Sequence, residues 1–416
     1  MYKPAVRRGR RTCRENVRVF VYKLPAKFNL GILQDCRHLN LHTNMCPHIA
    51  NCGLGRPLGE VLGAPSSSWF ATHQLLAEMI FHARLENHPC RTLDPEGANL
   101  YYVPFYGGLD ASNRSREVNF EARDALAIEF SDFIRRQKWW RRSNGKDHFI
   151  ALGRTAWDFV RNDGGNDYGA NRLLYMPSLR NMSVLLVERQ PREGPNQYGV
   201  PYPSYFHPST LEEVSTWQHQ VRVIDRPHLF SFVGATRTGV KRAAIRDDIV
   251  RQCNESSLCK LLKCDNNRGG SKCHDPSEVL NVMIRSVFCI QVTGDSFTRR
   301  STFDSFLTGC IPVFFSPHAA YTQYTWYLPT DPNSYSVYIE DKGGRNSSNT
   351  KSMDIEQELV RIPKDKVERM RKRVIDLIPT LTYMHPNSTE DFGFRDAVDV
   401  ALASLSKHVK SRRLPL

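Results

Sequence analysis

The strongest constraint on the fold of this chain is the stretch 287–315, which reads VFCIQVTGDSFTRRSTFDSFLTGCIPVFF. Residues 287–292 are apolar and rich in β-branched side chains, a composition that predicts a buried strand, and residues 293–296 are typical of a turn. Apolar residues then recur at i, i+3 and i+4, which predicts a helix that ends at Gly309. Residues 311–315 predict the next strand, so the stretch is a strand–turn–helix–strand unit.

Such a unit offers a binding site for an anion where the turn meets the helix. Free backbone N–H groups and the helix dipole point toward a ligand at that position, and guanidinium groups suit phosphate oxygens. We therefore predict that this stretch holds the diphosphate of a nucleotide sugar. A core unit with solvated arginines is the alternative that this stretch leaves open. The predicted donor-binding residues here are Gly294, Asp295, Ser296, Arg299, Arg300, Ser301 and Asp304.

Length and charge restrict the remaining possibilities. A chain of 416 residues exceeds the size of one growing core, so two domains are expected. Its 57 basic and 43 acidic residues give a net charge of +14, which favours anionic partners or simply a basic surface. No nucleic-acid-binding motif is present, so we exclude nucleic acid as a partner. Residues 1–16 are basic and predict a stem-like N-terminal segment.

The eleven cysteines and five N-x-S/T sequons indicate a lumenal, oxidising compartment. The cysteine spacings do not form a paired zinc pattern, and the odd total leaves at least one thiol outside intrachain disulfides. No run of 18 apolar residues and no signal-peptide core is present. We therefore expect an N-terminal membrane anchor that this sequence does not include.

The rest of the chain alternates between strands and helices, which predicts two parallel α/β domains facing each other across a cleft. Residues 188–208 carry five prolines and predict an irregular segment between the domains. We expect an acceptor-side domain at 17–208, a donor-side domain at 209–385, and a C-terminal helix and tail at 386–416. Expected strands are 17–22, 100–106 (closed by Gly107-Gly108), 148–153, 182–187, 229–233 and 335–339, and expected helices are 69–85, 117–138, 241–253, 277–285, 353–361, 365–378 and 394–409.

Two further residues of the second half belong to the predicted donor site. Gly234 and Arg237 follow the strand at 229–233, and ligands of open parallel sheets bind at the carboxyl ends of strands. The chain contains no Asp-x-Asp, the pair of carboxylates with which many nucleotide-sugar enzymes hold a divalent cation. We therefore predict no metal and no cofactor, with the leaving diphosphate stabilised by arginines and a helix dipole.

The first half is expected to supply the general base and the acceptor site. Candidates for the base are His148, His73 and Asp110, since a histidine that titrates near neutral pH suits this role. A structural role in the core is the alternative for each histidine. Aromatic side chains in 198–207 suit stacking on sugar rings or anchoring of the segment. The predicted acceptor-binding residues are Tyr106, Arg154, Tyr202 and Tyr205.

Five motifs in unbroken order resemble the exostosin-like glycosyltransferases of plants, in particular the xyloglucan galactosyltransferase branch. They are NLYYVPFYGGLD, NGKDHFIALGRTAWDF, GVPYPSYFHP, LFSFVGATR and GDSFTRRSTFDSFLTGCIPVFFSPHAAYTQYTWYLP. The resemblance extends from about residue 17 to residue 407. It implies a GT-B fold, an inverting reaction without metal, and a type II membrane protein of the Golgi. By position it also implies that Arg237 and the loop 294–301 bind the donor and that Asp304 meets the ribose.

The reaction expected from this resemblance is transfer of galactose from UDP-galactose to a xylosyl hydroxyl of xyloglucan. UDP-arabinose and UDP-galacturonate are alternative donors, because relatives in this branch use different sugars. The resemblance also implies complexes with other Golgi glycosyltransferases. A non-catalytic partner that binds glycan is the alternative from a different class, and retention of a diphosphate site in Arg237, Arg299 and Asp304 argues against it.

Overall fold

The first unit of the fold is a parallel sheet of six strands in the order β2-β1-β3-β4-β5-β6. The computed structural model describes residues 13, 17–63, 66–114, 117–162, 169–192, 194–236, 245–264, 273, 275–340, 353–388 and 393–413. Every residue of β5 is buried, which explains the apolar run at its centre, residues 184–187. The strands are β1 (Val19–Val21), β2 (Arg91–Thr92), β3 (Leu100–Tyr102), β4 (His148–Thr155), β5 (Ser183–Glu188) and β6 (Gln197–Gly199).

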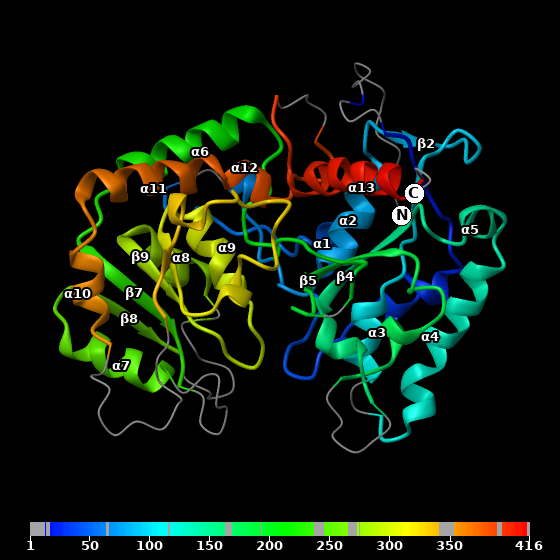
Figure 1. Cartoon of the computed structure of the whole chain (residues 1–416), viewed down its shortest axis with the longest axis horizontal. Helices are drawn as coiled ribbons and strands as arrows, with labels where there is room; N and C mark the ends of the chain where they lie inside the picture. Colours follow the sequence, from blue (N-terminus) through cyan, green and yellow to red (C-terminus); the bar gives the residue numbers. More distant parts are fainter. Residues whose placement is uncertain are drawn as a thin grey trace.

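Helices cover this first sheet, as alternation along the chain predicts (Figure 1). Asn119 begins α4, where its side chain accepts a hydrogen bond from the backbone N–H of Glu121. The helices of this unit are α1 (Ala50–Gly53), α2 (Ala77–Glu86), α3 (Gly107–Arg114), α4 (Phe120–Arg135) and α5 (Lys138–Ser143).

The second unit contains a parallel sheet of five strands in the order β11-β10-β9-β7-β8. The chain leaves β7 toward β8 on one side and then crosses back to β9 on the other. The strands are β7 (His228–Gly234), β8 (Cys259–Lys263), β9 (Ser286–Gln291), β10 (Ile311–Phe314) and β11 (Val337–Tyr338). Its helices are α6 (Leu211–Val223), α7 (Ile245–Glu255), α8 (Pro276–Ile284), α9 (Arg300–Leu307), α10 (Ile355–Val360) and α11 (Lys364–Asp376).

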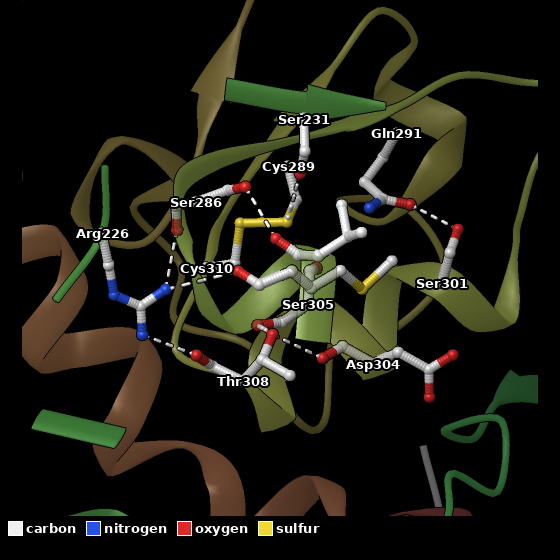
Figure 2. Close-up of a disulfide and its surroundings, with 12 residues drawn as sticks. Arg226, Ser231, Ser286, Cys289, Gln291, Ser301, Asp304, Ser305, Thr308 and Cys310 are labelled. Atoms are coloured by element: carbon white, nitrogen blue, oxygen red, sulfur yellow. Dashed lines mark hydrogen bonds between the residues drawn. A yellow bond between two sulfur atoms is a disulfide. The ribbon is translucent and has the colours of Figure 1, made fainter. Parts of the chain in front are cut away.

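A half-buried arginine joins the ends of three helices in the second unit. Arg226 donates hydrogen bonds to the carbonyls of Ser286 and Thr308, both at 2.7 Å (Figure 2). It also reaches the carbonyls of Val221 and Met283, near the ends of α6 and α8, at 3.4 Å. Carbonyls at helix ends attract a cation, although burial and the neighbouring Arg371 lower the pKa of Arg226 to about 9. The C-terminal end of α9 is thereby fixed, which sets the direction in which its N-terminus points.

The stretch 287–315 folds as its sequence predicts, into β9, a turn, α9 and β10. Gly309 ends α9 with a φ of +64°, a conformation that favours glycine. A disulfide between Cys289 and Cys310 joins β9 to the residue that precedes β10 (Figure 2). The strand–turn–helix–strand prediction is therefore confirmed.

The C-terminal part of the chain returns from the second unit to the first. After α12 (Ile378–Leu381), the long helix α13 (Ala397–Arg413) contacts α2 (Figure 1). Buried apolar side chains form one cluster that contains residues of both sheets, including Tyr102 and Phe288. The chain thus has the GT-B architecture, two parallel α/β units facing each other, and the predicted fold class is confirmed. The predicted boundary after residue 208 lies in the connection between β6 and α6.

Three expected elements differ from the structure. The helix expected at 69–85 begins only at Ala77, because Trp69 and Phe70 form isolated β-bridges with other segments. Gly107 and Gly108 open α3 rather than close β3. The irregular segment 188–208 contains the short strand β6.

Ten of the eleven cysteines form disulfides, and Cys52 is the free thiol that the odd total requires. Among the residues that the structure describes, no helix is both long enough and apolar enough to cross a membrane. The disulfides are Cys13–Cys90, Cys36–Cys46, Cys253–Cys259, Cys264–Cys273 and Cys289–Cys310.

Candidate active site

The order of strands in the second sheet places a candidate site between β7 and β9. The chain adds β8 on one side of β7 and then β9 on the other side, so the strand order reverses between β7 and β9. Ligands of open α/β sheets bind at such a point, outside the carboxyl ends of the strands. Gly234 is the last residue of β7, and Gly294 follows β9 by three residues. The structure therefore brings together two segments that were predicted to bind the donor. Arg237 lies outside the described residues.

Arg246 of α7 fixes these two strand ends to one another. Its guanidinium donates to the carbonyls of Ala235 at 2.9 Å, Thr293 at 3.0 Å and Val292 at 3.3 Å. The side chain is buried, with 8% of its surface exposed. Arg246 was not among the residues predicted from the sequence. The sequence shows it only as one arginine near the start of an amphipathic helix. The rim of the candidate site is rigid because one cation holds three carbonyls there.

The turn after β9 is folded around Arg299. This side chain donates to the Thr298 carbonyl at 2.6 Å and to the Ser296 hydroxyl at 3.0 Å. A Cβ atom at Gly294 would lie 1.9 Å from Nη2 of Arg299, so a side chain there would displace the Arg299 guanidinium. Asp295 is exposed and Ser296 is partly exposed. Arg299 therefore shapes the turn from within.

Arg300 begins α9, and its guanidinium faces the first unit. Nη1 donates to the Thr72 carbonyl at 2.7 Å, and the guanidinium carbon lies 3.5 Å from the centre of the Tyr205 ring. Nε lies 3.5 Å from a carboxylate oxygen of Asp304. Nε and Nη2 are both buried, and neither has a hydrogen-bond acceptor among the described residues. Nε thus faces the Asp304 carboxylate, whereas the buried Nη2 has no such partner among the described residues, and a cation at a helix N-terminus favours an anionic ligand.

The neighbours of Arg300 connect α9 to its surroundings. Ser301 donates to the side-chain oxygen of Gln291 at 2.6 Å, which joins the helix to the end of β9. Asp304 accepts a hydrogen bond from Ser204 at 2.6 Å. Burial raises the pKa of Asp304, and Arg300 and Ser204 oppose this shift. The carboxylate of Asp304 thus contacts both Arg300 and the connecting segment, a position beside the candidate anion site.

His73 is the base candidate that lies beside this cluster. Burial together with His48, Arg300 and Arg154 lowers the pKa of His73 to about 3. Its Nδ1 accepts a hydrogen bond from the backbone N–H of Leu75 at 3.3 Å. The imidazole is therefore neutral, and in this tautomer Nε2 carries the hydrogen. A base with so low a pKa removes protons poorly at neutral pH, unless an anion offsets the nearby arginines.

The structure separates His148 from the cluster and pairs Asp110 with an arginine of its own helix. His148 begins β4, so it lies at the opposite edge of the sheet from the carboxyl ends of the strands. It is buried, its Nδ1 lies 2.8 Å from Asp147 and its Nε2 lies 2.9 Å from the Tyr22 hydroxyl. Asp110 is buried in α3 and pairs with Arg114 at 2.7 Å, and burial raises the pKa of Asp110 to about 6.

Three of the four acceptor candidates lie near the cluster. Tyr205 packs against Arg300, and the Tyr202 hydroxyl lies 3.1 Å from the Thr298 hydroxyl. Arg154 is near the carboxyl end of β4 and pairs with Asp158 at 3.0 Å. The fourth, Tyr106, is buried in a separate apolar cluster, where its hydroxyl lies 2.9 Å from the His82 ring nitrogen. Its position is that of a core side chain.

Comparison with known proteins identifies the chain. Residues 13–351 match the family model described as the Exostosin GT47 domain. The chain is a member of the exostosin GT47 family. It is therefore a glycosyltransferase, as the motifs predict.

Named relatives of this family member align along nearly its whole length. It is 59% identical over 400 residues to the probable xyloglucan galactosyltransferase GT17 of Arabidopsis thaliana, covering 96% of this chain and 84% of that protein. It is 43% identical over 397 residues to the xyloglucan galactosyltransferase MUR3 of the same plant, covering 95% of this chain and 62% of MUR3. It is 38% identical over 394 residues to the xyloglucan-specific galacturonosyltransferase 1 of this plant, covering 94% of this chain and 57% of that protein.

A glutamate that sequence reasoning did not select holds the N-terminus of α3 in this exostosin-family enzyme. The Glu78 carboxylate accepts hydrogen bonds from the backbone N–H groups of Gly108, Leu109 and Gly153. Burial raises the pKa of Glu78 to about 7 despite these bonds. Gly153 precedes Arg154, so Glu78 fixes the carboxyl end of β4 where an acceptor candidate lies. Among the described residues, no three His, Cys, Asp or Glu side chains gather as a metal site.

Proposed function

We propose that this exostosin-family enzyme transfers galactose from UDP-galactose to a xylosyl side chain of xyloglucan, with inversion at the anomeric carbon and without a metal ion. The observation that carries the proposal is the 59% identity, over 96% of the chain, to a relative named a probable xyloglucan galactosyltransferase. The geometry of α9 supports it, because Arg300 places a buried Nη2 without an acceptor among the described residues at the helix N-terminus, where anions bind favourably.

In the proposed reaction, a xylosyl hydroxyl attacks the anomeric carbon of the donor and UDP leaves. Arg300 and the N-terminus of α9 stabilise the negative charge that develops on the diphosphate. His73 is the base that we propose, since it lies beside Arg300 and Arg154. The proton of the attacking hydroxyl would pass to Nδ1, which accepts the Leu75 N–H in the structure, so that hydrogen bond breaks in the reaction. A bound diphosphate would offset the charge of Arg300, one of the causes that lower the pKa of His73. The tyrosines Tyr202 and Tyr205 are proposed to border the acceptor.

We also propose that the enzyme works in the Golgi lumen as a type II membrane protein, in complexes with other Golgi glycosyltransferases. Five disulfides and five sequons support an oxidising, glycosylating compartment.

The test is a donor panel with xylosylated xyloglucan oligosaccharide as acceptor. Incubation with UDP-galactose is expected to raise the mass of the oligosaccharide by one hexose, measured by mass spectrometry. A uronate increment from UDP-galacturonate would instead assign the alternative donor, since one relative, 38% identical to this chain, is named a xyloglucan-specific galacturonosyltransferase. A pentose increment would assign UDP-arabinose. No transfer from any of the three donors would contradict the proposed function.

The metal-free mechanism predicts that excess EDTA leaves the transfer rate within about twofold of its untreated value, because arginines and a helix dipole replace a Lewis acid. The rate is measured with the donor that the panel identifies, before and after dialysis against EDTA. Loss of activity that added manganese restores would contradict this mechanism.

A further inference from the structure

A carboxylate of the first unit is completely buried against the donor-side turn of the second unit. Glu188 is the last residue of β5 and has no exposed surface. Its Oε1 accepts hydrogen bonds from Trp157 Nε1 at 2.9 Å and from the Phe297 backbone N–H at 3.3 Å. Its Oε2 accepts from the Thr298 backbone N–H at 2.7 Å and from the Thr298 hydroxyl at 2.5 Å. Three of the four donors belong to the turn that precedes α9.

Glu188 has no cationic partner within ion-pair distance among the described residues. Each of its two carboxylate oxygens accepts two hydrogen bonds, and all four come from neutral groups. Burial of a carboxylate without a cation opposes folding unless every lone pair finds a donor. An apolar side chain at this position would leave all four donors buried without an acceptor, which destabilises the folded turn. The arrangement therefore points to a requirement for a specific geometry in the turn.

The residues that Glu188 holds lie directly before Arg299 and Arg300, the two arginines predicted to bind the UDP-sugar. Thr298 also contacts the Tyr202 hydroxyl at 3.1 Å, and its carbonyl accepts the hydrogen bond from Arg299 at 2.6 Å. Arg300 follows and begins α9. A displacement of Thr298 would therefore move the Arg299 side chain and the first turn of α9 together.

We propose that Glu188 is a positioning residue of the transfer reaction, which sets the turn 297–300 of the donor site against the acceptor-side unit. This inference rests on the proposed function, because it assumes that the turn binds the diphosphate of a UDP-sugar. Glu188 does not contact the donor in this assignment. It acts through Thr298, so that the arginines are placed for the diphosphate before the donor arrives.

Glutamine is the sharpest replacement for Glu188. Its amide keeps the shape of the carboxylate but presents one oxygen and one NH₂ group. In either orientation, the NH₂ group faces two of the four donors, so about half of the contacts become repulsive. The matched control is Glu212→Gln, because Glu212 is an exposed residue of the first turn of α6 and undergoes the same chemical change.

The experiment measures UDP binding by calorimetry, steady-state kinetics and thermal unfolding for wild type, Glu188→Gln and Glu212→Gln. Glu188→Gln is expected to weaken UDP binding and raise KM for the UDP-sugar by about tenfold, with acceptor KM within about twofold of wild type. Glu212→Gln is expected to match wild type. UDP affinity within about twofold of wild type in Glu188→Gln would overturn the proposal, because a merely structural role lowers Tm without changing the site of the folded protein.

A second variant decides the matter if Glu188→Gln does not fold. Thr298→Val removes one hydroxyl donor and leaves the backbone contact, so UDP binding is expected to weaken by about threefold to tenfold. Unchanged UDP affinity in this variant would overturn the proposal. Transfer that fails in wild type while UDP still binds contradicts the proposed function only. Wild type that does not bind UDP contradicts both proposals.

Discussion

Replacing Arg300 by methionine is expected to lower kcat/KM for sugar transfer by about 10²- to 10³-fold. Methionine keeps part of the packing on Tyr205 but removes the charge and all donors. The loss is expected to be large because Nη2 is buried and has no acceptor among the described residues, so it is available to an anionic ligand. A cation aimed at the diphosphate at the N-terminus of α9 contributes most when negative charge develops on the leaving group. Steady-state kinetics with UDP-sugar and acceptor check this prediction.

Two further variants separate this effect from general destabilisation. Arg361→Met makes the same change at an exposed residue after α10, and its kcat/KM is expected to equal that of wild type. Arg300→Lys keeps the charge but not the planar fork, so an intermediate loss is expected. If Arg300→Met retains wild-type kcat/KM, the assignment of this helix N-terminus to the donor is wrong. A lower Tm with unchanged activity of the folded fraction would assign Arg300 to the interface between the units.

Strand and helix predictions succeeded where periodicity was strong. The centres of β5 and β9 are apolar at successive positions, since both faces of a parallel sheet are covered. β8 was missed because Cys259–Lys263 is a short edge strand in which only Leu262 is buried, so its apolar signal is weak. The helix expected from residue 69 began late because Trp69 pairs with Phe206, a contact that helical period cannot reveal.

The candidate site was partly predictable for a topological reason. Residues that follow strands, such as Gly294 and Arg300, meet at one edge of a parallel sheet whatever the details of packing. The same rule disfavours His148, which precedes the body of β4 and therefore lies at the other edge. Glu188 and Arg246 were not predictable, because their partners come from distant segments: Glu188 and Thr298 are 110 residues apart. A single glutamate after an apolar run gives no sign of such a partner.

The junction between α13 and the first unit carries a buried cluster of charges. Arg84 of α2 donates to Asp396 at 2.9 Å, and the side chains are 2% and 0% exposed. His88 Nε2 lies 2.7 Å from Asp399, and the backbone N–H groups of Asp396 and Asp399 each donate to the other's carboxylate. Burial raises the pKa of Asp399, but the hydrogen bond with His88 and the charge of Arg84 outweigh burial and hold it below its ordinary value. The cluster joins the C-terminal helix to α2.

Replacing Arg84 by methionine is expected to lower the free energy of unfolding by about 3–5 kcal/mol, because the carboxylates of Asp396 and Asp399 would remain buried without their main counter-charge. Denaturant unfolding at neutral pH measures this. Asp399 has a folded-state pKa below its unfolded value, so its contribution is complete above the unfolded pKa and is lost as pH falls through the folded one. The decrease in unfolding free energy between neutral and low pH is therefore expected to be smaller in Arg84→Met than in wild type.

The matched control for this prediction is Arg369→Met, because Arg369 pairs with Asp365 on the exposed face of α11. Its unfolding free energy is expected to change by less than about 1 kcal/mol, as is usual for exposed ion pairs. The double variant Arg84→Met/Asp396→Leu is expected to recover part of the loss, since it removes a buried charge together with its partner. If Arg84→Met and Arg369→Met lower stability equally, the cluster does not hold α13 in place and apolar packing of the helix does so alone.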